Sequence, residues 1–325
     1  MKIRHPDRTR DPGNEDVREP GFPPVEGVVS RPDRQPLLYA AVWFTALVLI
    51  ALSLFLMGRF FHLNDWSGGR EIIMTTLGNP IFWGAVAVGF LAQAVDGALG
   101  MAYGITSTTF LLAMGASPAT ASASVHIAEV FTTGVSGISH ARFGNVNKQL
   151  FVRLLAPGII GAVLGVVVVT QVDGAALKPW VSAYLLLMGI YVLSRAFRKL
   201  RLRAQPPRHV GKLALFGGFI DAVGGGGWGP VVTTTLVGSG HDPRTTIGSV
   251  NFAEFFLTLA GAAAFSLLME TTAWTIIAGL VFGGLFAAPF AALLCRQLSA
   301  RTLLVLVGTL IGALSLFNLC QALLP

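Results

Sequence analysis

Apolar segments long enough to cross a lipid bilayer recur from Leu37 almost to the end of the chain. A helix needs about 20 apolar residues to cross the hydrocarbon core. Only 12% of the 325 residues are charged, whereas soluble domains have about a quarter. The segments leave no room for a separate soluble domain. The sequence therefore predicts an all-α polytopic membrane protein and argues against a large soluble helical protein.

Eleven helical segments are expected along the chain. Residues 1–36 are rich in proline and charge, and we expect them to form a disordered cytoplasmic arm. No cleavable leader pattern precedes segment 37–57, which is therefore expected to remain as an extra transmembrane helix. A basic linker, 199–209, separates a first repeat (80–198) from a second (210–325). The ten segments of these repeats are 80–95, 104–114, 118–141, 147–170, 176–198, 210–224, 229–239, 242–268, 271–295 and 299–323.

The two sets of five segments are copies of one ancestral unit. The stretch "DGALGMAYGITSTTFLLAMGASPATASASVHIAEVF" begins at Asp96, and "DAVGGGGWGPVVTTTLVGSGHDPRTTIGSVNFAEFF" begins at Asp221. At this constant offset, 15 of the 42 residues in 96–137 are identical to their counterparts, with no gap. Such self-similarity indicates an internal duplication.

The distribution of positive charge predicts how the copies are oriented. If each segment reverses the chain, 20 of the 23 Lys and Arg residues fall on one side, and only Arg59, Arg70 and Lys178 fall on the other. The positive-inside rule makes the rich side cytoplasmic. Five segments per copy then place the second copy upside down relative to the first, as in many secondary transporters. The N-terminus is expected in the cytoplasm and the C-terminus on the opposite side.

One segment in each copy is too short to span a bilayer. Segments 104–114 and 229–239 have 11 residues, about 16 Å of helix, and each follows a glycine-rich break. We expect re-entrant half-helices whose free amides point at a binding site near the membrane midplane, which suits an anion. Alternatively, these glycines and threonines only allow helices to pack closely. The candidate substrate-binding residues are Gly100, Tyr103, Gly104, Thr108, Thr109, Ser124, Gly225, Gly226, Gly227, Trp228, Gly229, Thr233, Thr234, Ser249 and Asn251.

Four acidic residues lie within predicted membrane segments and occupy equivalent positions in the two copies. No Lys or Arg lies at a similar depth. Carboxyl groups in a membrane are costly and usually functional. They are expected either to carry a proton coupled to substrate movement, with a histidine beside them, or to cap and cross-link the broken helices. The candidate proton-coupling residues are Asp96, Asp221, Glu129, Glu254 and His126.

Other kinds of function find little support in the sequence. The basic residues are not interleaved with aromatic ones, which argues against nucleic-acid binding, and Cys295 and Cys320 fit no metal-site spacing. The "GVSG" motif at 134–137, with His140, is similar to the GxSG of rhomboid proteases, but the second copy has "LAGA" there. The aspartate pair lacks the GxGD of membrane aspartyl proteases. We therefore expect neither an enzyme nor a bound metal, and an intramembrane hydrolase is a remote alternative.

The residues around the breaks resemble those of the sulfite exporter TauE/SafE family of bacterial membrane transporters. The resemblance covers about residues 80–323 and is carried by "GGGGWGPVVTTTL", "ATASASVHIAEVFTTGVSGISHARFGNV" and "TTIGSVNFAEFF". The first copy departs from the family pattern, because "GALGMAYG" replaces a run of glycines. The resemblance implies a multi-pass protein of the bacterial inner membrane that exports sulfite or small organosulfonates, driven by protons and without a cofactor.

The sequence leads to one main hypothesis and one main alternative. The hypothesis is a secondary transporter with inverted repeats, whose partners are a small sulfur oxyanion, protons and the lipid bilayer; a homo-oligomer is compatible with it. The alternative is a proton-coupled cation exchanger, because four membrane acids without a base favour a cation.

Overall fold

The computed structural model describes residues 35–60, 66–197, 209–239, 241–269, 273–297 and 300–323. In these ranges the regular structure is entirely helical, which confirms the expected all-α class. Most of the arm and of the basic linker lies outside the described residues. Five helices are long and apolar enough to cross a membrane, or six if the bent pair Arg70–Leu77 and Pro80–Asp96 is one span.

The helices follow the segments expected from the apolar pattern. An N-terminal α1 (Pro36–Phe60) is followed by α2 (Trp66–Leu77), a short helix that the sequence analysis did not predict. The helices of the first copy are α3 (Pro80–Leu99), α4 (Tyr103–Ala113), α5 (Pro118–Arg142), α6 (Lys148–Gln171) and α7 (Gly174–Arg195). Those of the second are α8 (Val210–Gly224), η5 (Gly229–Thr233), α9 (Thr234–Gly238), α10 (Pro243–Leu268), α11 (Trp274–Gln297) and α12 (Ala300–Leu323).

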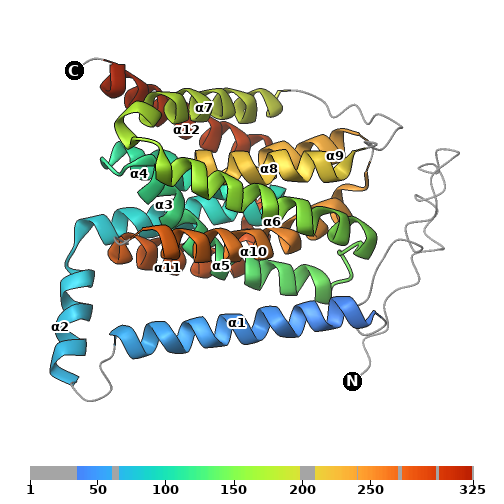
Figure 1. Cartoon of the computed structure of the whole chain (residues 1–325), viewed down its shortest axis with the longest axis horizontal. Coiled ribbons are helices and arrows are strands. Elements are labelled where there is room, and N and C mark those ends of the chain that lie inside the picture. The colour runs from blue at the N-terminus through green and yellow to red at the C-terminus, as the bar shows by residue number, and fades with distance from the viewer. Residues whose placement is uncertain are drawn as a thin grey trace, which may run out of the picture.

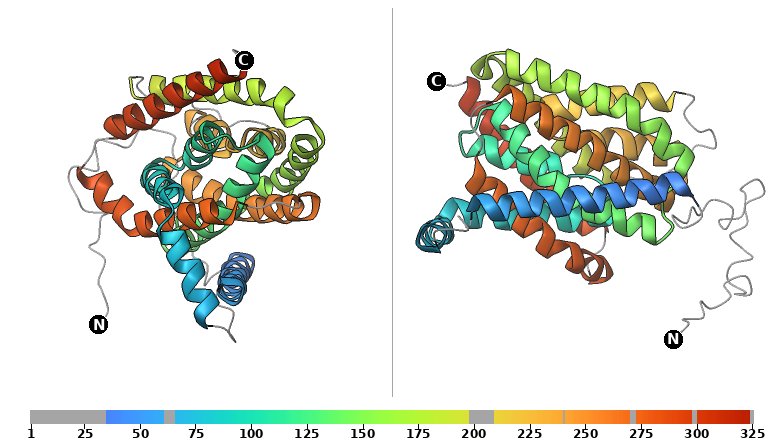
Figure 2. Two further views of the ribbon diagram at one scale, coloured as in Figure 1. Left: turned by 90° about the vertical axis from the view of Figure 1, so that its left-hand side faces the viewer. Right: turned by 60° about the horizontal axis from the view of Figure 1, so that its bottom comes forward.

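Most of the long helices run roughly along one axis of the molecule, and α2 lies across it (Figure 1). The helix α1 lies at the periphery, on the opposite side of the bundle from α7 and α12 (Figure 2). Its side chains nevertheless contact the long central helices. The ring of Phe44 stacks on Phe256 of α10, and Leu49 lies against Gly134 of α5.

The first helix of each copy packs against the fourth helix of the other copy. Glycines make these contacts close: a Cβ added to Gly161 of α6 would lie 2.1 Å from the carbonyl oxygen of Leu215 in α8. In the equivalent pair, a Cβ on Gly283 of α11 would lie 2.1 Å from the Val86 oxygen of α3. Small residues let backbones approach in this way in membrane helices. The two copies are therefore interleaved rather than side by side.

The third helices of the two copies, α5 and α10, pack against each other and run in opposite directions. Along α5 and α10, Gly137 lies against Phe252, while Gly134 lies against Phe255. Nearer the start of α5, His126 contacts Gly261. The residue number falls on one helix as it rises on the other, so α5 and α10 are antiparallel.

A left-handed glycine ends the first helix of each copy. Gly100 has φ 64° at the end of α3, and Gly225 has φ 63° at the end of α8. In both, the glycine amide donates back to the carbonyl of the aspartate four residues earlier, Asp96 or Asp221. This is the αL cap that glycine favours, since it has no Cβ to clash. The duplicated Asp-x-x-x-Gly spacing thus sets the point at which each helix breaks.

Candidate functional site

The two breaks meet inside the bundle. A Cβ added to Gly104 would lie 2.6 Å from the Cα of Gly226, so the two backbones are in direct contact. Two threonines then cross between the copies: Thr108 donates to the carbonyl of Gly225, and Thr233 donates to that of Gly100 at 3.2 Å. These bonds are reciprocal, because each partner in one is the duplicate of a partner in the other. Reciprocal contacts of this kind are what a two-fold relation generates.

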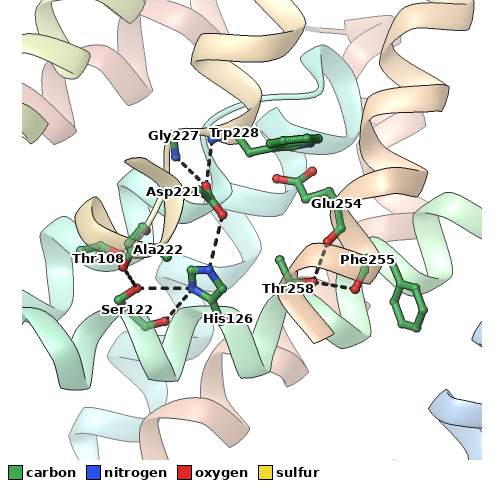
Figure 3. A network of polar contacts seen from close by, with 12 residues as sticks. Thr108, Ser122, His126, Asp221, Ala222, Gly227, Trp228, Glu254, Phe255 and Thr258 are labelled. Atoms are coloured by element: carbon green, nitrogen blue, oxygen red, sulfur yellow. Dashed lines mark hydrogen bonds and ion pairs between the residues drawn. The ribbon is translucent and has the colours of Figure 1, made fainter. Parts of the chain in front are cut away.

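Aspartates accept hydrogen bonds from amides at the start of each half-helix. Asp221 Oδ1 accepts from the amides of Gly227 at 2.7 Å and Trp228 at 2.8 Å, as Figure 3 shows. Asp96 accepts from the amide of Tyr103, the duplicate of Trp228. In this structure the carboxyl groups of the chain itself therefore occupy the amides that were expected to face an anion.

The other oxygen of Asp221 faces a histidine. His126 Nε2 lies 3.5 Å from Asp221 Oδ2, and its Nδ1 lies 2.9 Å from the carbonyl oxygen of Ser122, one turn earlier on α5. The Ser122 hydroxyl donates to the carbonyl of Ala222 at 2.6 Å, which joins α5 to the end of α8. His126 is fully buried and Asp221 is 1% exposed. Serine, histidine and aspartate thus form one buried chain of polar contacts (Figure 3).

The two glutamates are also buried near the breaks. Glu129 Oε1 lies 3.0 Å from the position of a Cβ added to Gly104, and its Oε2 has no hydrogen-bond partner. Glu254 interacts electrostatically with Asp96, Glu129 and Asp221. The structure therefore brings all four duplicated acids into one region, where their charges influence one another.

The remaining predicted site residues are placed in several ways. Thr109 and Thr234 donate to carbonyls one turn earlier on their own helices, those of Ile105 and Pro230. Ser249 accepts from the amide of Asn147, away from the acids. Three others are buried: Ser124 is 1% exposed, Gly229 lies beside Gly100, and Asn251 is 3% exposed with no hydrogen-bond partner for its Oδ1.

The aromatic residues of the two half-helices fix the backbone. The Tyr103 hydroxyl donates to the Leu280 carbonyl at 3.1 Å, and Trp228 Nε1 donates to the Val250 carbonyl at 3.1 Å. Both side chains are at most 2% exposed. Each ring therefore anchors a half-helix to a helix of the second copy.

Two residues at the site were not found by sequence reasoning. One is Ser122; the other is Tyr184 of α7, whose hydroxyl donates to the Gly226 carbonyl at 2.9 Å. Each donates a hydrogen bond from its hydroxyl to a backbone carbonyl that lies far away in the sequence. Each differs from its duplicate, Ile247 and Thr309, so the repeat comparison gave no signal for either.

The charge of the site is unbalanced. Among described residues with assigned burial, the buried charged side chains are the four acids, and no Lys or Arg is buried with them. The described part of the chain contains no group of three or more His, Cys, Asp and Glu side chains that could hold a metal ion.

Comparison with known proteins assigns the chain to a family. The family model for the sulfite exporter TauE/SafE matches residues 85–317, which include both breaks and all four acids. The chain belongs to the sulfite exporter TauE/SafE family. This TauE/SafE protein is also 45% identical over 244 residues to the probable membrane transporter protein YtnM of Bacillus subtilis (strain 168), a match that covers 71% of this chain and 81% of that relative. No solved structure matches the chain.

These findings confirm the family resemblance expected from the sequence. The family is named for the export of sulfite and the relative is named as a probable membrane transporter, which fits the apolar helices of the described chain. The matched region begins within α3, so α1 and α2 precede the part that this TauE/SafE protein shares with the family model.

Proposed function

We propose that this protein is a proton-coupled secondary transporter that exports a small sulfur oxyanion, either sulfite or an organosulfonate, across a bacterial inner membrane. The observation that carries the proposal is the position of Asp221, which holds the amides of Gly227 and Trp228 with one oxygen and faces His126 with the other. An oxyanion needs the same amide donors that this carboxylate now uses. Substrate and carboxylate therefore compete for one set of donors.

This competition gives a physical reason for coupling to protons. If an oxyanion binds the two amides, Asp221 loses its hydrogen bonds in a site that contains three other acids and no buried Lys or Arg among the described residues. A carboxylate left without donors in a low-dielectric site is costly, and a proton removes that cost. Binding of the anion is thus linked to uptake of a proton by Asp221, and the two cross in the same direction. Export then follows the outward gradient of the anion and, for doubly charged sulfite, the inside-negative membrane potential. When the proton leaves, the carboxylate returns to the amides and expels the anion.

The arrangement of the helices supports alternating access by two inverted repeats. The antiparallel contacts of α5 with α10 are those expected of such repeats. At the start of α10, Arg244 donates to Asn145 at 2.6 Å, so α10 begins where α5 ends. The helix α6 also begins where α5 ends, and it runs parallel to α8, because Gly161 and Gly165 of α6 contact Leu215 and Phe219 of α8 in the same order. The helix α8 therefore begins at the same end of the bundle as α10. The segment between α8 and α10 must then return to its starting side, as a re-entrant half-helix does.

A specific observation favours a second candidate function. Four buried acids in mutual electrostatic contact would attract a cation rather than an anion. The alternative is therefore a cation exchanger coupled to protons. The amides at the breaks and the family membership favour the anion.

Transport measurements on purified protein in liposomes separate the two functions. We expect radiolabelled sulfite, or ethanesulfonate, to accumulate when a pH gradient is imposed, and the rate to fall to that of protein-free vesicles without the gradient. The same vesicles, given a gradient of radiolabelled sodium, should show no protein-dependent flux. Protein-dependent sodium flux without anion flux would support the exchanger and contradict our proposal.

A further inference from the structure

Hydrogen-bond partners fix where protons lie on His126. The Ser122 carbonyl oxygen, 2.9 Å from Nδ1, can only accept. The Ser122 hydroxyl, 3.4 Å from the same nitrogen, donates to Ala222 and therefore presents a lone pair to the ring. Two acceptors thus face Nδ1, so Nδ1 carries a proton.

A second proton must then lie between the histidine and the aspartate. With Nδ1 protonated, a neutral ring has a lone pair on Nε2. That nitrogen faces Asp221 Oδ2 at 3.5 Å, and neither atom has another hydrogen-bond partner. Two lone pairs facing each other in a buried site repel. One proton, on Oδ2 or on Nε2, converts the repulsion into a hydrogen bond or an ion pair.

The first break lacks the serine and the histidine of this arrangement, because the second copy has other residues at the matching positions. The duplicate of His126 is Asn251, an amide that does not titrate in the physiological range, and the duplicate of Ser122 is Ile247. Ile247 contacts the first break directly: a Cβ added to Gly100 would lie 2.8 Å from its Cγ2. The first break is therefore packed by an aliphatic side chain at the place where the second is bonded to a serine and a histidine.

The other titratable groups around Asp221 are acids and a phenol. Asp96 of α3, Glu129 of α5, Tyr184 of α7 and Glu254 of α10 all interact with it electrostatically. Negative charge on any of these acids favours retention of a proton by the pair. His126 is the only base among the groups that interact with Asp221 in the described part of the chain.

We propose that the proton shared between His126 Nε2 and Asp221 Oδ2 is the single proton moved in each transport cycle, and that the first break, at Asp96, carries none. The proposal rests on the proposed function, because it names the group that couples protons to the anion. The proton joins the pair from the side to which the site is open while Asp221 still holds the amides, as in this structure. It stays with Asp221 while the anion holds the amides, and it leaves to the other side as the carboxylate returns to them. Ser122 is a positioning residue that keeps Nδ1 protonated and aims Nε2 at the acid.

Nitrogen NMR of histidine-labelled protein tests the protonation pattern without any substrate. His126→Asn identifies the signals of His126 among the six histidines. We expect Nδ1 to be protonated, and we expect Asp221→Asn to shift the Nε2 signal by much more than Asp96→Asn does. A ring protonated on Nε2 with a bare Nδ1 would overturn the proposal, whether or not the protein transports sulfite.

Exchanging the two residues tests the role in transport. In His126→Asn, sulfite uptake driven by a pH gradient should fall at least about tenfold, within the range typical of energetic coupling between sites. Exchange of internal for external sulfite, which needs no net proton movement, should persist. The double variant His126→Asn with Asn251→His moves the histidine from the first copy to the matching position of the second and should recover part of the response, and Asn251→His alone is the matched control.

The outcomes separate this inference from the function on which it rests. If wild-type protein moves no sulfite in response to a pH gradient, the proposed function fails, and NMR still decides the proton pair. If wild-type protein is coupled and His126→Asn responds to the gradient as wild type does, the proton pair is wrong and the proposed function survives.

Discussion

The two breaks share one backbone design but differ in the side chains around it. Both have an aspartate, a left-handed glycine four residues later and a threonine that reaches the opposite break. Only the second break is bonded to a serine, a histidine and a tyrosine from the other copy. The duplication thus supplies the scaffold, whereas the differences between matched residues at 122, 126 and 184 create chemical asymmetry. We expect variants at matched positions to separate these two contributions.

The largest effect is expected at Gly226, whose duplicate is Met101. Gly226 has φ 148°, and a Cβ there would lie 2.2 Å from the Ile105 amide nitrogen. Gly226→Ala should therefore destabilise the protein by about 3 kcal/mol or more and abolish transport. The matched control is Gly238→Ala, since nothing lies within 4 Å of a Cβ on that helical glycine. Thermal unfolding in detergent would contradict the account if both variants unfold at the wild-type temperature.

A smaller effect is expected from the reciprocal threonines. Thr108→Val removes the donor to Gly225 and leaves a buried carbonyl unpaired, which should cost about 1–3 kcal/mol of stability. Thr233→Val should cost less, because its bond to Gly100 is long, at 3.2 Å. Thr235→Val is the control, as its exposed hydroxyl bonds only to its own helix. Equal stability of all three variants would show that the crossing bonds do not hold the breaks together.

The smallest effect is expected from Tyr184, whose duplicate Thr309 is exposed. Tyr184→Phe keeps the ring against Gly224 and removes the hydroxyl that lies beside Gly227 and donates to the Gly226 carbonyl. We expect a loss of about 1 kcal/mol, seen as a roughly fivefold higher KM for sulfite. Thr309→Val should leave the KM unchanged. A Tyr184→Phe variant with the wild-type KM would remove this residue from the site.

Local sequence patterns predicted most of the fold. The lengths and positions of the apolar segments predicted helices close to those observed, and Asp242 caps the start of α10 through the Thr245 amide. The glycine-rich breaks predicted where α3 and α8 end and where the short helices α4 and η5 begin. Residues 66–77 were not predicted as a helix, because a 12-residue stretch with Gly68 and Gly69 has neither spanning length nor high helix propensity. The π-helical turn at Gly229–Thr233 left no local signal either.

The site could be predicted only in part, because its decisive contacts join different copies. The duplicated acids and glycines were visible as repeats, and their roles in binding and coupling remain predictions. The pairing of His126 with Asp221 was not visible, since helical spacing places His126 near Glu129 on its own helix. Similarly, the use of Asp221 as a cap for the amides at 227 and 228 depends on a left-handed turn whose geometry only the structure shows.

The most direct test of the account compares Asp221→Asn with Asp96→Asn in vesicles that contain a trapped pH-sensitive dye and receive a sulfite gradient. Both asparagines can still accept from the amides, so both variants should fold, as size-exclusion profiles would verify. After subtraction of the signal from protein-free vesicles, we predict proton movement with sulfite in wild type and Asp96→Asn, and none in Asp221→Asn. Proton movement that is undiminished in Asp221→Asn, or lost equally in both variants, would contradict the claim that one asymmetric pair couples protons to the anion.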